Sequence, residues 1–375
     1  MKFQVDRDLI AEAAVWVGRV IPQRPAQPIL RGIHIIAADN KLIISGSDLD
    51  VRNQEIISAN VIEPGEVLIS GRLLSDIMRA LPAAPIDVAS DGTRIEITSG
   101  RSSFTLQTMP TAEYPPALEI PEASGTVNAK DFTTAISQIG VAAARDDFRQ
   151  HLTGINFIVE GTDIELAATD GNRLAVAKLN WSPTSAKIST TALVPAKYIV
   201  DIAKTLSPSD DITLSFAQGN EGLIGITAGN RQTISRTIAS TFPTYKSLLD
   251  FEPTSTVQID TAKLIETVKR ISLVLDHNSP IALSFEDGET CVFGAGGIGE
   301  RSEAREYLES TLTGEGLTLG FFPHFLIEGL SSLNGAVTEI SLTAPMKPAL
   351  LIGKPEIDAP ASDAHKYLLL PRRLD

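Results

Sequence analysis

The sequence is poor in several residue types, and each shortage excludes a class of protein. Its single cysteine, Cys291, cannot form an internal disulfide, which suits a reducing compartment. Five scattered histidines beside one cysteine argue against a structural zinc site, and we predict neither a metal nor a cofactor. No uninterrupted apolar run reaches about 18 residues, so we expect no transmembrane helix and no membrane partner.

Positive charge is scarce as well. The 32 lysines and arginines are outnumbered by 46 aspartates and glutamates, which gives a formal net charge of −14. On whole-chain charge alone, nucleic acid would be a poor choice of partner. Residues 1–8 bring Asp6 and Asp8 where a signal peptide needs an apolar segment, so we expect a cytoplasmic protein.

The remaining composition is that of an ordinary globular protein. Hydrophobic residues make up 43% and charged residues 21%, which excludes wholesale disorder. A length of 375 residues predicts two or three domains, because a typical domain has about 150 residues.

The chain contains three copies of one unit, which recur about every 125 to 130 residues. Each copy opens with an aliphatic residue, a helix-capping residue and an amphipathic helix, and the capping residues are Asp6, Asn128 and Asp260. Three matches in order at similar spacing indicate a triplication.

A second amphipathic segment follows in each copy, at residues 70–82, 195–208 and 322–334. Short alternating runs bounded by turn residues lie between the helices, as at residues 41–46 and 163–168, and are typical of antiparallel strands. We therefore predict an α+β fold of three similar domains, each with two helices packed on antiparallel sheet.

Proline-rich segments separate the copies. Residues 114–122 and 242–253 are predicted to be extended, fairly stiff linkers. The predicted domains span residues 1–122, 123–252 and 253–375.

Signals for catalysis are weak. The loop from Gly294 to Gly299 matches G-x-G-x-x-G, but the repeat places it at a strand-to-strand connection, where a dinucleotide site would need a helix on parallel sheet. The acidic pairs at residues 146–147 and 210–211 fit solvated turns, and no metalloprotease, nucleophile-elbow or P-loop motif occurs. We favour a non-enzyme, and keep as an alternative an NAD(P)- or flavin-binding oxidoreductase that uses this loop.

Basic residues recur at equivalent positions of the second helix. Arg72 and Arg79 lie nearly two helical turns apart and share the face opposite the apolar residues, and Lys197 and Lys204 repeat this spacing. One such pair is an ordinary solvated face, whereas its repetition around an axis predicts a concave positive surface inside an acidic shell. Salt screens charges beyond about 10 Å, so distant acids need not repel a phosphate backbone.

Short motifs along the whole chain carry a family resemblance. They include Arg24-Pro25, residues 169–174 (TDGNRL), 242–245 (FPTY) and 367–374 (YLLLPRRL). In this order they resemble the bacterial DNA polymerase III beta subunit, the sliding clamp. The resemblance implies a homodimer that closes head to tail into a six-domain ring around duplex DNA, held by topology rather than base readout. It also implies that the DNA polymerase III alpha subunit, the clamp loader, repair polymerases and ligase bind through short peptide motifs.

The resemblance and the repeated helical pairs together define a predicted DNA-binding set. Its members would donate to phosphates and carry no sequence information. Gln150 and His151 stand where family members often have aromatic residues. The set is Arg24, Arg72, Arg79, Arg149, Gln150, His151, Lys197 and Lys204.

The resemblance also implies a hydrophobic pocket for partner peptides between the second and third domains. Gly171 would allow close backbone approach, and Arg173 would be a hydrogen-bonding residue on the rim. Asn172 stands where a histidine is common, Arg372 replaces a frequent apolar residue, and Asp375 extends the tail. The matching positions are Leu152, Thr169, Gly171, Asn172, Arg173, Leu174, Pro243, Ser247, Leu248, Met346, Pro348, Leu368, Leu370, Pro371 and Arg372.

Ring closure needs complementary edges on the first and third domains. Opposite charges beside apolar residues would set the orientation more than they add affinity. The candidates are Arg94, Arg101, Phe104 and Leu106 on the first domain, and Leu273, Val274, Glu300, Glu303 and Glu306 on the third. A repeat-built scaffold that binds only protein is the second alternative to a clamp.

Overall fold

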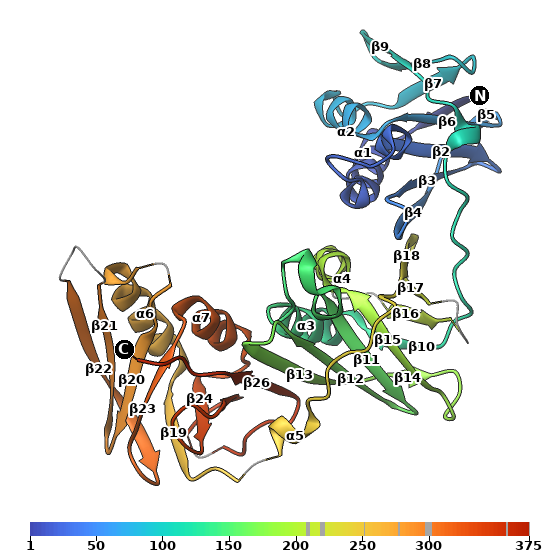
Figure 1. Cartoon of the computed structure of the whole chain (residues 1–375). Helices are drawn as coiled ribbons and strands as arrows, with labels where there is room; N and C mark the ends of the chain where they lie inside the picture. Colours follow the sequence, from blue (N-terminus) through green and yellow to red (C-terminus); the bar gives the residue numbers. More distant parts are fainter. Residues whose placement is uncertain are drawn as a thin grey trace. The chain divides into compact units, whose positions relative to one another are not determined.

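The computed structural model describes residues 1–207, 211–217, 222–250, 252–276, 278–296, 302–357 and 359–374 (Figure 1). The chain folds into two compact units. Unit 1 comprises Met1–Ala129, Pro183–Ser185 and Ser207–Thr237, and unit 2 comprises Lys130–Ser182, Ala186–Leu206 and Ile238–Asp375. Among the described helices, none has the length and apolar character needed to cross a membrane.

Unit 1 is built from two antiparallel sheets and two α-helices. The helices are α1 (Arg7–Val17) and α2 (Gly71–Ala80). The strands are β1 (Lys2–Val5), β2 (Gly32–Ala38), β3 (Lys41–Ser47), β4 (Val51–Ser58), β5 (Asn60–Glu63), β6 (Gly65–Ser70), β7 (Ile86–Ser90), β8 (Arg94–Ser99), β9 (Ser102–Gln107), β10 (Gly125–Asn128), β14 (Ser182–Pro183), β16 (Asp211–Phe216), β17 (Leu223–Ala228) and β18 (Arg231–Arg236). Their orders are β5-β1-β7-β8-β9 and β14-β10-β16-β17-β18-β4-β3-β2-β6.

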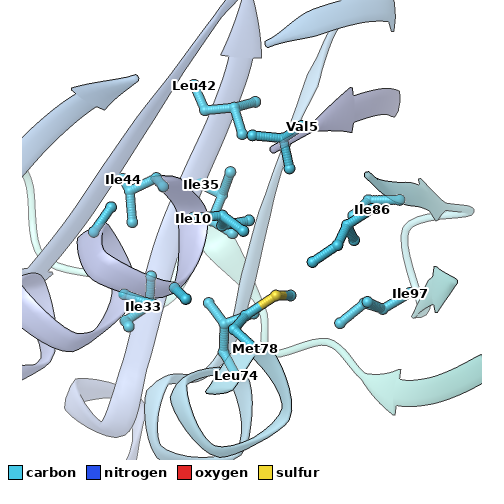
Figure 2. Close-up of a cluster of buried hydrophobic side chains, with 14 of the residues drawn as sticks. Val5, Ile10, Ile33, Ile35, Leu42, Ile44, Leu74, Met78, Ile86 and Ile97 are labelled. Atoms are coloured by element: carbon cyan, nitrogen blue, oxygen red, sulfur yellow. The ribbon is translucent and has the colours of Figure 1, made fainter. Parts of the chain in front are cut away.

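The core of unit 1 lies between α1, α2 and the two sheets. Figure 2 shows Leu74 and Met78 of α2 directed toward the same interior as Ile10 of α1 and Ile86 and Ile97 of the five-stranded sheet, and all five are buried. Leu73, the residue before Leu74 in α2, does not belong to this core. Leu73 is 50% exposed, because it lies one residue round the helix from the core-facing stripe.

A polar seam joins the first and middle thirds of the chain inside unit 1. Strand β4 pairs antiparallel with β18, so that one sheet continues from one third into the next. The Thr233 hydroxyl donates to the Asn53 side chain at 2.8 Å, and Arg231 lies 3.1 Å from the carboxylate of Glu55, which is buried. The sequence did not predict this pairing.

Unit 2 contains one sheet of twelve strands. The strands are β11 (Gly154–Glu160), β12 (Asp163–Thr169), β13 (Arg173–Asn180), β15 (Ser189–Pro195), β19 (Ser255–Asp260), β20 (Ile281–Glu286), β21 (Glu289–Ala295), β22 (Glu303–Thr313), β23 (Leu317–Phe321), β24 (Val337–Leu342), β25 (Ala349–Lys354) and β26 (His365–Leu369). Their order is β15-β11-β12-β13-β26-β25-β24-β19-β22-β21-β20-β23. The antiparallel pair β13 and β26 joins the middle and last thirds.

The helices of unit 2 repeat the plan of unit 1. They are α3 (Ala129–Gly140), α4 (Ala196–Ala203), α5 (Lys246–Leu249), α6 (Thr261–Ile271) and α7 (Pro323–Ser332). In each third a strand leads into a helix twice: β1 into α1 and β6 into α2, β10 into α3 and β15 into α4, β19 into α6 and β23 into α7. Figure 1 shows α6 and α7 together on one side of the neighbouring strands. The predicted triplication of an α+β unit is thus visible in the element order.

Two of the predicted helix-capping residues cap their helices, whereas the second predicted linker differs from the prediction. The Asp6 carboxylate accepts from the amides of Asp8 and Leu9, and that of Asp260 accepts from Lys263, so both cap their helices as predicted. The second predicted linker is not wholly extended, however. It contains α5, preceded by Tyr245, which is buried in an apolar cluster of unit 2.

His365 gives unit 2 a predicted sensitivity to acid. This histidine opens β26, is buried, and has no hydrogen-bond partner for either ring nitrogen within the described residues. Burial lowers its pKa from 6.5 to about 4. Between pH 6.5 and about 4, the imidazole of His365 is protonated in the unfolded chain but stays neutral in the native chain. The free energy of unfolding therefore falls as the pH drops through this range.

We expect this effect to lower the free energy of unfolding by about 2 kcal/mol between pH 7.5 and pH 5. Urea unfolding of the wild type and of His365→Gln at both pH values measures it, because the variant cannot titrate at this position. The same pH dependence in both proteins would contradict the assignment.

Candidate functional site

An arginine-lined cleft opens beside the helices of unit 1. Its volume is about 1010 Å³, and it is bordered by the end of α1, the segment that follows α1, and one side of α2 from Gly71 to Arg79. Five of its lining residues are arginines and one is a carboxylate: Arg19, Arg24, Arg31, Arg72, Arg79 and Asp76. The cleft therefore concentrates positive charge in a chain whose net charge is −14.

Three of the residues predicted to bind DNA meet in this cleft. Arg24, Arg72 and Arg79 all line it, and the Arg72 side chain is 93% exposed, with Asp76 at 3.9 Å. A contact this long between exposed groups holds the guanidinium only weakly. Arg31 also lines the cleft but was not predicted, because it lies in a short 3-10 helix (Pro28–Arg31) without helical periodicity to mark it.

The other predicted DNA-binding residues belong to unit 2. Lys197 and Lys204 are exposed on α4 and just after it, with Lys197 5.3 Å from the Tyr198 ring and Lys204 3.9 Å from Asp201. Arg149, Gln150 and His151 lie in the 3-10 segment η4 (Asp147–Leu152).

Arg149 also lies next to the predicted peptide pocket. Its guanidinium is 3.5 Å from Asp146 and 3.2 Å from where a side chain on Gly171 would begin. The predicted DNA loop and the predicted pocket are therefore neighbours in unit 2.

The residues predicted to form the peptide pocket divide into buried apolar side chains and partly or fully exposed ones. Leu174 and Leu368 are almost fully buried, in a cluster that also contains Tyr245, Leu350 and Val176. Leu152 and Pro371 are buried as well, and Thr169, Pro348 and Arg372 are half-buried. The exposed members of the predicted set are Gly171, Pro243, Ser247, Leu248, Met346 and Leu370.

A tight turn connects β12 to β13 at this pocket. Asp170 accepts the amides of Asn172 at 2.8 Å and Arg173 at 3.2 Å, and Thr169 accepts the amide of Gly171. Gly171 has φ of +88°, a left-handed conformation that residues with a side chain rarely adopt. The backbone conformation therefore favours glycine here, whereas the Arg149 side chain could shift slightly to admit a Cβ atom.

Arg173 is not a rim residue, so this part of the prediction is wrong. It is 4% exposed, and its guanidinium binds Asp170 at 2.9 Å, Glu328 of α7 and the Tyr367 hydroxyl at 3.4 Å. It also lies 4.3 Å from the Phe325 ring. The carboxylates of Asp170 and Glu328 pair with the buried guanidinium of Arg173. Arg173 therefore links the β12–β13 turn to α7.

The charges of this network stabilise one another. Burial alone would lower the pKa of Arg173, but Tyr367, Glu328 and Asp170 together hold it above its usual value. Burial alone would raise the pKa of Glu328, but Arg173 and Arg145 hold it below its usual value. Both groups therefore stay charged at neutral pH, and Arg145, 77% exposed, binds the same carboxylate at 2.8 Å.

The two departures from the family pattern contact each other. The Arg372 guanidinium donates to the Asn172 side-chain oxygen at 3.1 Å and lies 4.3 Å from the Phe322 ring. The Leu370 amide donates to the Asn172 carbonyl at 2.9 Å. Asn172 thus anchors the C-terminal segment on the pocket turn.

The candidate edges for ring closure are exposed strands in each unit. Strand β9, with Phe104 36% exposed, is the last strand of its sheet. Strand β22 pairs with β21 through residues 303–309 but meets β19 only from residue 310 on. Within the described residues the first part of β22 therefore has one unpaired edge.

Two of the residues predicted beside this second edge differ in exposure and pairing. Leu273 is 84% exposed, in the 3-10 segment Ser272–Val274. Glu306 is not a free charge, because Arg270 binds it at 2.5 Å and Thr267 at 2.7 Å. Glu300 lies outside the described residues, as do Gly297 and Gly299 of the glycine-rich loop, Asp210 and Asp375.

The glycine-rich loop connects two antiparallel strands. Residues 289–295 of β21 pair with residues 303–309 of β22, and the Gly296 amide donates to the Ser302 carbonyl at 2.6 Å. Among the described residues that follow, the chain enters the antiparallel strand β22 and not a helix on parallel sheet, which is the context that a dinucleotide site needs. In the part of the chain that is described, no cluster of three or more metal-ligating side chains occurs.

Solved structures with this fold are DNA sliding clamps. The Bacillus subtilis DNA polymerase sliding clamp matches with a TM-score of 0.92 at 24% identity, and the match covers 100% of both chains. A Pseudomonas aeruginosa sliding clamp bound to griselimycin matches with a TM-score of 0.91 at 25% identity, again over 100% of both chains. The chain has the three-domain sliding-clamp fold.

Sequence comparison identifies the family. Three family descriptions match in succession: DNA polymerase III beta subunit, N-terminal domain over residues 1–119, central domain over 126–244 and C-terminal domain over 246–372. The beta sliding clamp of Streptomyces coelicolor is 42% identical over 376 residues, covering 100% of both chains. The chain belongs to the DNA polymerase III beta subunit family.

Proposed function

We propose that this chain is the DNA sliding clamp of a replication machinery. It closes head to tail with a second copy into a ring, encircles duplex DNA without reading its sequence, and tethers DNA polymerase III and repair proteins to the template. It acts as a processivity factor without catalysis, and it works in the cytoplasm. The main support for this proposal is that three clamp-domain models match the chain in succession. The cleft lined by five arginines supports it further.

The cleft explains how an acidic protein can hold DNA. Guanidinium groups donate to phosphates in any sequence, which is what a sliding contact needs. Salt screens the more distant carboxylates over about 10 Å, so the local charge decides the interaction. An oxidoreductase would need a dinucleotide site, and the antiparallel β21–β22 connection does not supply one.

Topological binding gives the decisive experiment. After loader-assisted assembly, we expect the protein to stay on nicked circular DNA during gel filtration and to be lost when the circle is cut once. A ring slides off a free end, whereas a protein held only by contacts does not. Equal retention on circular and linear DNA would reject the clamp in favour of a protein held by contacts alone. No retention on either DNA would leave the protein-only scaffold.

The pocket of unit 2 is proposed to receive the peptide motifs of polymerase, clamp loader, repair polymerases and ligase. Its buried leucines offer an apolar floor, and the exposed Leu248, Met346 and Leu370 offer contacts that an incoming apolar side chain would cover. The P. aeruginosa relative with griselimycin supports ligand binding in this family. Arg173 supports the turn from beneath.

Leu370 provides a matched test of this pocket. It is 38% exposed, and Leu374, outside the proposed set, is 40% exposed. We expect Leu370→Ala to weaken a polymerase-derived peptide about tenfold, measured by fluorescence anisotropy, because an apolar rim contact is lost. Leu374→Ala is the control, and an equal loss in both variants would remove Leu370 from the pocket.

Ring closure is proposed to join β9 of one copy to the first part of β22 of the other. Each offers unpaired backbone groups, and Phe104 and Leu106 could cover Leu273 and Val274. Arg94 and Arg101 would face Glu303, while Glu306 stays paired with Arg270. The three domains are proposed at residues 1–122, 123–252 and 253–375.

A further inference from the structure

The unit 1 cleft has the charge of an anion site and the shape of a groove. Five guanidinium groups surround it, and among the described residues Arg19, Arg24, Arg31 and Arg79 have no ion-pair partner. Clustered like charges repel one another unless an anion enters. The cluster therefore favours a bound ligand over a purely stabilising role.

The remaining walls complement the arginines. Val15, Ile21 and Pro22 add aliphatic surface. Ser70 and Gly71, at the start of α2, also line the cleft, and the Ser70 side chain does not cap this helix. Free amides at a helix N-terminus favour an anion, which adds to the pull of the arginines.

The volume of the cleft limits what can enter. At about 1010 Å³ it lies at the top of the range of small-ligand pockets, about 300 to 1,000 Å³. It can accept a few linked nucleotides, whereas the body of a duplex can only lie across its mouth. Guanidinium groups suit the phosphates of such a strand, and the aliphatic wall suits its sugars.

We propose that this cleft binds the sugar–phosphate backbone of a single DNA strand, and that Arg19 and Arg31 bind it together with Arg24, Arg72 and Arg79. The inference rests on the proposed clamp function for the identity of the strand. It adds a binding mode that topology does not supply, because a short single strand cannot be trapped by a ring. Its failure is therefore separable from failure of the clamp.

The test uses the full-length protein and a fluorescent ten-residue oligothymidylate in an anisotropy titration at several salt concentrations. We expect saturable binding that weakens with salt. The double variant Arg19→Gln/Arg31→Gln should bind about tenfold more weakly and reduce the slope of log affinity against log salt by about 1.4, because each single-strand phosphate contact contributes about 0.7. Both arginines are exposed, so their replacement leaves the core intact.

A control variant distinguishes binding in the cleft from binding elsewhere on the protein. Lys2→Gln/Lys41→Gln removes two exposed cations of unit 1 that do not line the cleft, and should leave affinity and slope unchanged. An equal loss in this control, or no loss in Arg19→Gln/Arg31→Gln, would overturn the proposal.

A competition with sodium tripolyphosphate distinguishes a DNA strand from a free phosphorylated compound. If the cleft takes a strand, tripolyphosphate should displace the oligothymidylate only at concentrations far above those of the oligomer. If tripolyphosphate binds in an arginine-dependent way and the oligothymidylate does not, the occupant is a free polyphosphate and the strand proposal is wrong. Retention on circular DNA is measured in parallel and reports on the ring alone.

Discussion

Replacing Arg173 by methionine should lower the free energy of unfolding by about 3 kcal/mol. The side chain is 4% exposed and joins Asp170, Glu328 and Tyr367. Without the guanidinium, the carboxylate of Asp170, which is also buried, loses a charged partner inside the protein. Urea unfolding followed by circular dichroism measures the loss.

Arg145 supplies the matched control, since it binds the same Glu328 carboxylate at 2.8 Å but is 77% exposed. Arg145→Met should cost less than about 1 kcal/mol, because water replaces an exposed ion pair at little loss. Arg173→Lys should remain destabilised, since one ammonium group cannot serve three partners in this planar arrangement. Equal costs at positions 145 and 173 would show that burial does not govern the network.

Replacing Leu74 by alanine should lower the free energy of unfolding by about 2 to 5 kcal/mol. Leu74 is fully buried in the core of unit 1, beside Met78 and Ile10 (Figure 2). Truncation removes buried methyl groups and leaves a cavity that the two sheets and helices fill only in part. Thermal unfolding or urea titration gives the difference.

Leu73→Ala is the control for this substitution, because it makes the same change one residue earlier in the same helix. Leu73 is 50% exposed, so we expect a change within about 0.5 kcal/mol. The two substitutions share helix propensity, and their difference isolates burial. A large loss at Leu73 would indicate that this side chain is covered by another copy of the protein.

Much of the fold could be predicted from the sequence because its signals are local. Asp6 and Asp260 precede amphipathic helices and cap them through amides two or three residues away. Asp39 and Asn40 form the β2–β3 turn with φ of 49° and 55°, which these residue types tolerate. The triplication reinforced each local signal by repeating it.

The rest depended on contacts between distant residues. Arg173 meets Glu328 across 155 positions and Tyr367 across 194, and no local pattern marks such partners. Its charge suggested an exposed residue, whereas its carboxylate neighbours made burial possible. Arg31 was missed because its short 3-10 helix has no helical periodicity to mark it. Only the folded chain shows that it lines the same cleft as Arg24 and Arg72.

We expect the Asn172–Arg372 hydrogen bond to affect which inhibitors the proposed pocket accepts. The pair fixes a side-chain amide and a guanidinium beside the turn of the proposed pocket, where the family resemblance implies a histidine and an apolar residue in many members. A compound designed to contact a histidine and an apolar residue at these two positions should bind this protein more weakly. It would contact the Arg372 guanidinium where it needs an apolar side chain. An inhibitor with an acceptor aimed at Arg372 would instead prefer clamps of this kind, and resistance by substitution at one of the two positions would sacrifice the anchor of the C-terminal segment.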